Sequence, residues 1–196
     1  MLLNTHGAAL TDTNSPIPAA GFLFDMNRFF QALISRFLGE NLVGYEVQDE
    51  RVLRGVFSYD PANNPRNHRS PLLRPDFLVL RNHKVKAVLD AKYRDLWERN
   101  LPREMLYQLA LYALGQESGD RRATMIYPTL EDAARQQIVL VKDPLRGTSK
   151  AEITLRPVNL LKLDLLLRDR SAHAQRGRIE LAMCLAFGEP PDVSTN

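Results

Sequence analysis

Two carboxylates and a lysine fall close together in the segment 74–94, which reads RPDFLVLRNHKVKAVLDAKYR. Asp76 opens one apolar run, and Asp90 with Lys92 closes the next, with a short polar stretch between the two runs. This pattern is typical of a β-hairpin. Side chains on a strand alternate between faces, so Asp90 and Lys92 share one face. A three-residue loop centred on His83 would set Asp76 opposite Asp90, with Cβ atoms about 5 Å apart, which suits one shared cation.

This trio has the composition of a metal site for phosphodiester hydrolysis. Mg²⁺ takes oxygen ligands, usually one or two carboxylates together with waters and phosphate oxygens. We therefore expect Asp76 and Asp90 to hold Mg²⁺, with Mn²⁺ able to substitute and the backbone carbonyl of Ala91 as a third ligand. A bound metal lowers the pKa of its water and neutralises charge on the reacting phosphate. Lys92 would orient the attacking water or stabilise that charge.

A solvated, charged face of a half-exposed sheet is the alternative interpretation of the same residues, because Asp-x-Lys alone is a weak motif. The context of the motif favours a site. Both carboxylates interrupt apolar runs that would otherwise be buried, and burying an unpaired charge is costly. Acids placed in this way within strands often mark functional sites.

The PD pair at 75–76, followed by DAK at 90–92, resembles the PD-(D/E)xK nuclease superfamily, whose core is a mixed sheet flanked by helices. Two further stretches are similar to the McrC family, the nuclease subunits of McrBC-type restriction systems, which cut DNA containing modified cytosine. These stretches are FLFDMNRFF at 22–30 and YQLALYA at 107–113. The resemblance runs over about 22–128 and is looser beyond.

The resemblance implies an α/β fold with a restriction-endonuclease-like mixed β-sheet flanked by helices. It also implies a Mg²⁺-dependent DNA endonuclease that works with a McrB-like GTPase ring, since the chain itself has no GxxxxGK(S/T) phosphate-binding loop. Supporting roles fall to Gln31, Gln108 and Tyr112. The family commonly has a glutamate where this chain has Gln31, and an amide brings no charge to a metal, so metal affinity is expected to be lower.

Two other functions fit the same residues. One is a non-catalytic or truncated nuclease-fold module for DNA binding or complex assembly. Gln31 favours it, as does the short stretch before the first predicted helix, where the family usually carries a region that engages the GTPase. The other is a metal nuclease that acts alone in DNA repair. The intact trio of Asp76, Asp90 and Lys92 favours catalysis over a non-catalytic module.

Helical periodicity is present on both sides of the hairpin. Apolar residues recur at three and four positions over 25–38, which predicts a helix that ends at Gly39. Gln31 lies at the edge of the apolar stripe, where an exposed surface amide is the alternative. A second helix is predicted over 102–115, where periodicity alone indicates a packed tyrosine and a surface glutamine. Further strands are predicted at 45–59, 124–127, 137–141 and 152–156, and further helices at 159–167 and 179–187.

Length and composition agree with one nuclease-like domain over 21–190, preceded by a flexible N-terminal arm at 1–20. The 196 residues are 44% hydrophobic and 25% charged, as is ordinary for a globular protein. The N-terminal arm is rich in Thr, Asn, Ser, Pro and Gly. No apolar run of about 18 residues is present, and no basic segment followed by an apolar one begins the chain. We therefore expect a cytoplasmic protein without a membrane anchor.

The polar loop at 60–70 is a candidate DNA contact. It contains Arg66, His68 and Arg69, and Arg94 follows the predicted active strand. Arginine suits bidentate contacts to phosphate. A net charge of +3 is too small to indicate nucleic-acid binding by itself, and a solvated loop is the alternative.

Overall fold

Six strands form one sheet in the computed structural model, which describes residues 24–116 and 121–188. The N-terminal arm predicted at 1–20 lies outside the described residues. In chain order the elements are α1 (Met26–Asn41), β1 (Glu46–Asp49), η1 (Pro61–Asn63), β2 (Phe77–Arg81), β3 (Lys84–Ala91), α2 (Arg103–Leu114), β4 (Arg122–Thr129), β5 (Gln137–Lys142), β6 (Ser149–Asn159), α3 (Leu160–Arg168) and α4 (Ala172–Phe187).

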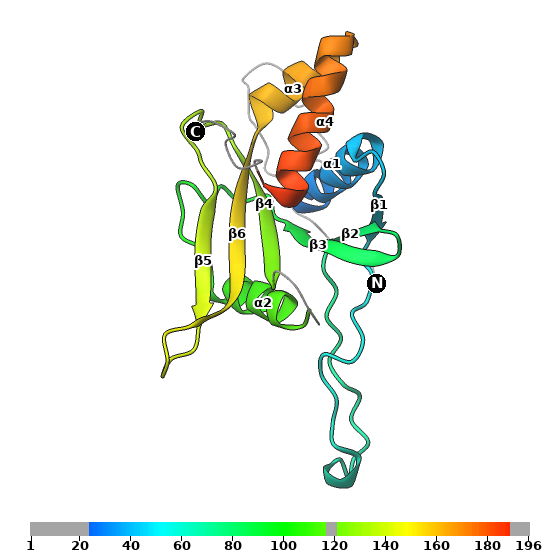
Figure 1. The fold of residues 1–196 in the computed structure, drawn as a ribbon, viewed down its shortest axis with the longest axis vertical. Helices are drawn as coiled ribbons and strands as arrows, with labels where there is room; N and C mark the ends of the chain where they lie inside the picture. The colour runs from blue at the N-terminus through cyan, green and yellow to red at the C-terminus, as the bar shows by residue number, and fades with distance from the viewer. Residues whose placement is uncertain (1–23, 117–120, 189–196) are drawn as a thin grey trace, which may run out of the picture.

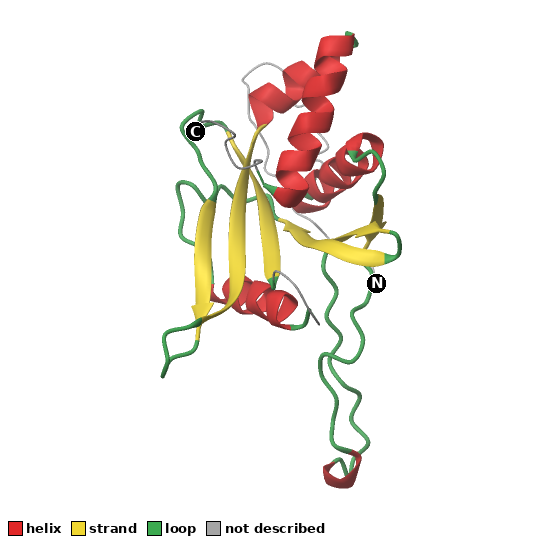
Figure 2. Ribbon diagram, viewed as in Figure 1, coloured by secondary structure: helices red, strands yellow, loops and turns green. Residues whose placement is uncertain are grey.

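The sheet is mixed, with strand order β1-β2-β3-β4-β6-β5. The central strands β3, β4 and β6 run parallel, whereas β1, β2 and β5 pair antiparallel with their neighbours. A parallel pair needs a crossover connection, and α2 supplies it between β3 and β4. Helices α1, α3 and α4 lie on one side of the sheet and α2 on the other (Figures 1 and 2). The predicted α/β class, a mixed sheet flanked by helices, is confirmed.

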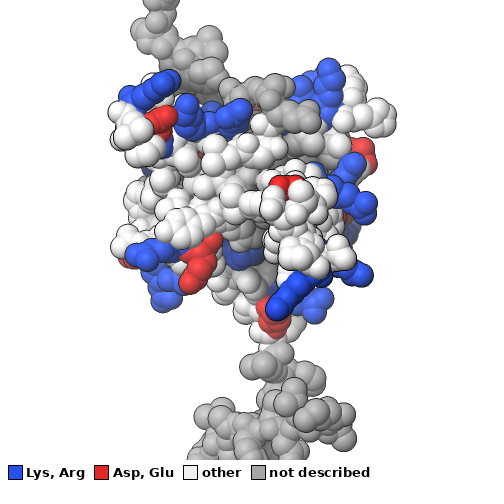
Figure 3. All heavy atoms as spheres, turned by 90° about the horizontal axis from the view of Figure 1, so that it is seen from below, with Lys and Arg blue, Asp and Glu red and all other residues white. Residues whose placement is uncertain are grey.

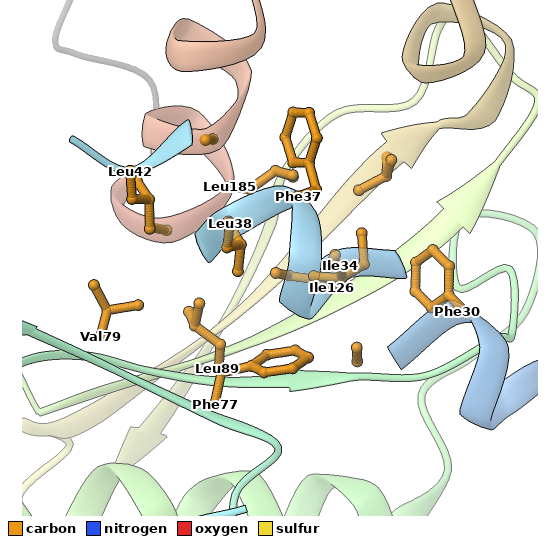
Figure 4. Packing of buried hydrophobic residues seen from close by; sticks show 14 of the residues in the cluster. Phe30, Ile34, Phe37, Leu38, Leu42, Phe77, Val79, Leu89, Ile126 and Leu185 are labelled. Carbon is orange, nitrogen blue, oxygen red and sulfur yellow. The ribbon is translucent and has the colours of Figure 1, made fainter. Parts of the chain in front are cut away.

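The two faces of the sheet carry separate apolar clusters. Phe30 and Ile34 of α1 pack with Phe77 of β2 in the first cluster, which α4 also covers (Figure 4). Leu78 belongs to the second cluster, with Tyr112 of α2. Neighbouring residues on a strand point to opposite faces, so Phe77 and Leu78 enter different clusters. Because apolar residues follow one another almost without interruption along β2, this strand is buried on both of its faces.

The β2–β3 hairpin closes differently from the predicted three-residue loop. Asn82 and His83 both have positive φ, 52° and 61°, and form a two-residue turn. A register shift within the pair then adds one residue to β3, and Phe77 pairs with Leu89. Asp76 and Asp90 occupy the next position of the hairpin beyond this pair, so their carboxylates face one another. The predicted three-residue loop would have given the same arrangement.

The first and last helices are longer than predicted. Gly39 does not end α1, because the buried apolar face continues through Leu42 and the helix runs on to Asn41. Asp25 begins it, since its carboxylate accepts hydrogen bonds from the backbone N–H groups of the first turn. None of the helices in residues 24–116 and 121–188 has the length and the apolar character that a membrane span requires.

Residues 50–75, here called the projecting loop, leave the sheet between β1 and β2 and extend away from the body of the molecule (Figure 1). Of the strands predicted at 45–59, only β1 forms. Beyond it, a single antiparallel bridge joins Leu53 to Leu73. From residue 57 to residue 72 almost every side chain is exposed, so apolar burial does not hold this part in place.

Replacing Ile126 with alanine should lower the free energy of unfolding by about 2–5 kcal/mol, because this fully buried side chain would leave a cavity in the first cluster. Ile138 on the edge strand β5 is a matched control, as it is 50% exposed. Ile138→Ala should cost less than about 1 kcal/mol. Urea denaturation of both variants checks this, and equal losses would contradict the assigned core.

Candidate metal and catalytic site

Asp76, Asp90 and Lys92 converge where β2 begins and β3 ends. Asp76 immediately precedes β2, Asp90 lies in β3, and Lys92 directly follows that strand. The Lys92 Nζ lies 3.1 Å from Asp90 Oδ2 and 3.5 Å from Asp76 Oδ2. One ammonium thus lies between both carboxylates, and the predicted trio is assembled in one place.

Asp90 is the most constrained member of the trio. It is 1% exposed, and neither of its carboxylate oxygens accepts a well-aligned hydrogen bond from a described residue. Its contact with Lys92 is therefore mainly the electrostatic attraction of an ion pair. Burial and, to a lesser extent, the charge of Asp76 raise the pKa of Asp90, Lys92 opposes both effects, and the resulting pKa is about 6. A buried carboxylate without hydrogen bonds is costly. A divalent cation would both neutralise and ligate these oxygens.

Lys92 remains a cation at neutral pH. Burial disfavours its ammonium, but the charges of Asp90 and then Asp76 outweigh that effect and hold the Lys92 pKa above its usual range. Its side chain is 22% exposed, so solvent or a substrate can reach it. It is therefore placed as a hydrogen-bond donor to negative charge and not as a base.

Asp76 is held by two donors, which leave it less freedom than an ordinary surface carboxylate. Gln31 Nε2 donates to Asp76 Oδ1 at 2.9 Å, and the backbone N–H of Ala91 donates to Oδ2 at 2.8 Å. Gln31 is half-buried on α1 and reaches the site across the end of the hairpin. It is therefore not the exposed surface amide that periodicity alone allowed. That the Ala91 carbonyl binds metal stays a prediction.

A second hydrogen-bonded pair supports the site from α2. Gln108 Nε2 donates to the Tyr112 hydroxyl at 2.6 Å, and that hydroxyl donates to the Arg74 carbonyl at 2.9 Å. Burial raises the pKa of Tyr112 to about 12, so the phenol stays neutral. These contacts fix the backbone two residues before Asp76. Neither Gln108 nor Tyr112 contacts the carboxylates of the trio by a hydrogen bond in the described chain, and their supporting role stays a prediction.

Asn27 is a site residue that the sequence patterns did not single out. The backbone N–H of Tyr93 donates to Asn27 Oδ1 at 2.8 Å, which holds the chain just after Lys92. Asn27 and Gln31 are one helical turn apart, so one polar edge of α1 contacts the residue just before β2 and the segment just after β3. This spacing, beside the apolar stripe, is the signal that could have identified Asn27.

The three predicted DNA-binding arginines are not brought together. Arg94 is exposed two residues beyond Lys92, whereas Arg66 and Arg69 are exposed near the end of the projecting loop. Figure 3 shows the molecule from the side toward which this loop points. In this view, basic side chains are more prominent than acidic ones around the edge of the molecule. The arginines therefore fall into two groups, one beside the trio and one away from it.

The donor set fits Mg²⁺. Among the described residues, no group of three His, Cys, Asp or Glu side chains is placed to share a metal ion, as a structural zinc site would require. Magnesium usually takes one or two carboxylates and completes its octahedron with waters and substrate phosphate oxygens. The pair of facing carboxylates, one of them buried and without a well-aligned hydrogen bond to either oxygen, meets that requirement.

Without metal, the free energy of unfolding should fall as pH rises from about 4, the usual Asp pKa, through about 6, the raised pKa of Asp90. Within this window the folded protein keeps a proton on Asp90 that the unfolded chain has already lost. The raised pKa therefore stabilises the folded protein at low pH, and this stabilisation is lost as pH rises. Over this window Asp90→Asn should remove about 2–3 kcal/mol of the pH dependence and be the more stable protein at pH about 7.5.

Urea denaturation with a chelator present, at several pH values, measures this difference. Asp132→Asn is the control, because the Asp132 carboxylate is 80% exposed at the surface. It should retain the pH dependence of the parent protein. An unchanged pH dependence in Asp90→Asn would show that Asp90 is not ionising in a buried site.

Comparison with known protein families gives a match to this chain. The family described as "McrBC 5-methylcytosine restriction system component" matches residues 1–128, which include the whole trio. The search of the curated proteins found no match.

A search of the solved structures found a chain of the "Refined half-complex from tetradecameric assembly of Thermococcus gammatolerans McrB AAA+ hexamers with bound McrC". It is 24% identical, with a TM-score of 0.48, and the alignment covers 81% of the present chain and 33% of that chain. The present chain thus spans about a third of the length of that relative. The family match covers well over half of the 196 residues, and on that ground this chain belongs to the McrBC 5-methylcytosine restriction system component family.

Proposed function

We propose that this protein is a Mg²⁺-dependent DNA endonuclease, the nuclease component of a McrBC-type restriction system that cuts modified-cytosine DNA with a McrB-like GTPase partner. The observation that carries the proposal is the buried Asp90 beside Asp76 and Lys92. Family membership supports the restriction system and its modified substrate. The partner follows from the family resemblance, because the chain has no phosphate-binding loop of its own. A cytoplasmic location belongs to the same proposal, since a restriction system acts on foreign DNA that has entered the cell.

Asp76 and Asp90 would hold the metal, with the Ala91 carbonyl as a third ligand and Mn²⁺ as a substitute for Mg²⁺. The ion supplies Lewis acidity toward the phosphate and a bound water of lowered pKa. The chain contributes preorganisation. The Gln31 amide and the Ala91 N–H keep the Asp76 carboxylate oriented before any ligand arrives, so less ordering is needed on binding.

Lys92 would provide the charge stabilisation. Its ammonium is already oriented by two carboxylates, and it is reachable from solvent. A donor of this kind acts on negative charge that grows on the phosphate oxygens, or it orients the attacking water. Arg94, exposed just beyond, would contact a neighbouring phosphate of the same strand.

A non-catalytic module is the second candidate, and the contact of Gln31 with Asp76 favours it. A neutral amide at this place contributes no charge to a metal, unlike the glutamate common in the family. The chain would then keep the nuclease fold for DNA binding or assembly. Cleavage assays separate the two functions.

Lys92→Ala should lower the rate of DNA cleavage by about 100-fold to 1000-fold, because a single well-placed donor contributes that much. Asp90→Ala should abolish cleavage, since the metal loses its buried ligand. The assay uses supercoiled plasmid, methylated and unmethylated, with Mg²⁺ or Mn²⁺, in the absence and presence of a McrB-like GTPase with GTP. Lys150→Ala, which removes an exposed lysine, is the matched control and should cut normally.

Cutting that appears only with the GTPase, only on methylated plasmid and only with intact Asp90 would support the full proposal. Cutting without the GTPase would support a nuclease that acts alone. Inactivity under every condition would overturn the enzymatic proposal and favour the non-catalytic module.

Gln31→Glu should raise the affinity for Mg²⁺ or Mn²⁺ several-fold, because a third carboxylate would then face the ion. Without metal the same change should lower the free energy of unfolding by about 1–3 kcal/mol, since the donor to Asp76 Oδ1 is lost and a like charge replaces it. Isothermal titration with Mn²⁺ and urea denaturation with a chelator measure the two effects. Gln175→Glu, on the exposed side of α4, should change neither. Unchanged metal affinity in Gln31→Glu would place Gln31 outside the metal site.

A further inference from the structure

We propose that the projecting loop, residues 50–75, is an arm that contacts the phosphate backbone of duplex DNA about one helical turn away from the scissile phosphate. This inference rests on the proposed function, because it takes DNA as the substrate of the site at the base of the loop. It adds a DNA-binding element outside that site and gives it a direction and a reach.

The base of the loop is fixed to the site. The Glu50 N–H donates to the Asp76 carbonyl at 2.9 Å, and the Leu53 N–H donates to the Leu73 carbonyl at 2.8 Å. The Tyr112 hydroxyl holds the Arg74 carbonyl at 2.9 Å. These contacts connect both limbs of the loop to β2 and α2. The loop therefore leaves the site in a defined direction.

Val56 adds a side-chain contact at the same base. A Cβ atom built on Gly115, at the end of α2, would lie 3.2 Å from the Val56 Cγ2. Such close approach shows that the first limb packs against the helix end, and Leu53 and Leu73 are also packed against the second apolar cluster. Beyond these residues the loop has no comparable anchor.

The outer part of the loop, residues 57–72, is ordered by its own polar contacts. The Asn64 side chain accepts from the His68 N–H and donates to the His68 carbonyl, both at 2.9 Å. The Tyr59 N–H donates to Ser70 Oγ at 3.2 Å. Asp60 caps η1 through the Ala62 N–H. An exposed segment with defined turns and almost no buried surface contributes little to the core, so its structure serves a contact outside the chain.

The charges of the loop match a phosphate backbone. Its cationic side chains are five arginines and no lysine, against only Glu50 and Asp60. Glu50 is 3.8 Å from Arg74, and the Asp60 carboxylate is occupied by its own turn. Within the described residues, no acidic side chain lies within ion-pair distance of the other four arginines. Arg51 donates a hydrogen bond to the Gln48 side chain, and Arg54, Arg66 and Arg69 are exposed. Arginine is suited to bidentate phosphate contacts.

The composition of the loop favours nucleic acid over a protein partner. Interfaces with DNA are polar and positively charged, whereas stable protein interfaces need a buried apolar centre. The outer loop offers asparagines, arginines and three exposed large apolar side chains, Phe57 at 36%, Tyr59 at 46% and Leu72 at 60%. The apolar side chains are too scattered to form such a centre.

The length of the loop sets its reach. Each limb has about 10 residues and, at about 3.3 Å per residue, extends about 30 Å from the sheet. One helical turn of B-DNA is about 34 Å. With Asp76 at the base against the scissile phosphate, Arg66 and Arg69 near the tip would reach the backbone about one turn along the duplex.

The test measures binding of a fluorescent duplex of about 30 base pairs to the full chain carrying Asp90→Asn, which blocks cleavage. Added to this background, the triple variant R54A/R66A/R69A should weaken binding at least tenfold. It should also reduce the slope of log K against log[KCl] by about 2 to 3, because each lost phosphate contact removes about 0.9. The control R146A/R170A/R176A removes the same charge from exposed positions elsewhere and should leave the slope unchanged.

Hydroxyl-radical footprinting of the same complexes tests the reach. The parent should protect about one helical turn more, on one side, than the loop variant. Equal effects of the two triple variants, no salt-dependent binding of duplex by the parent, or an identical footprint would each overturn the proposal. Thermal unfolding of the variants should match the parent, because the three arginines are exposed.

Plasmid cleavage in the background with intact Asp90 separates this inference from the proposed function. Asp90-dependent cutting that the loop variant and the control share equally would overturn the arm and leave the nuclease standing. Loss of duplex binding in the loop variant alone, in a protein that never cuts with any metal or partner, would support the arm and overturn the nuclease.

Discussion

The buried charge of Asp90 is the constraint on which the rest of the site depends. Its carboxylate is buried without an aligned hydrogen bond, so the ammonium of Lys92 compensates for it. Lys92 in turn requires Asp76 at 3.5 Å to hold its own charge in a half-buried place. Such a cluster is unfavourable for folding alone, and a cation bound beside it would offset that cost.

Hairpin geometry is what makes this cluster possible. A slip of one residue would turn every side chain of β3 to the other face. The two-residue turn at Asn82 and His83 would by itself produce that slip, and the register shift further along the pair reverses it. Irregularity in β3 is therefore a requirement for the facing carboxylates, not a defect of the strand.

The sequence predicts those parts of the site that depend on nearby residues. Asp76, Asp90 and Lys92 were identifiable because strand alternation and a short turn relate them directly. Contacts between distant segments, such as Gln31 with Asp76 or Asn27 with Tyr93, depend on how α1 packs, which periodicity does not determine. The first part of the projecting loop was predicted to be strand, because alternation of apolar and polar residues indicates a pleated segment. A strand also needs a neighbouring strand to which it can hydrogen-bond, and beyond β1 the two limbs of the loop share a single bridge.

Gln31 can be understood as a balance between folding and metal binding. Two carboxylates and one ammonium give the trio a formal charge of −1, and a glutamate in place of Gln31 would bring the charge of the site to −2. The amide instead donates to Asp76, which favours the metal-free fold. The expected result is weaker metal binding by the chain alone, since a third carboxylate is missing. A substrate phosphate that supplies oxygen ligands would then contribute a larger share of the affinity, so metal and DNA would bind cooperatively.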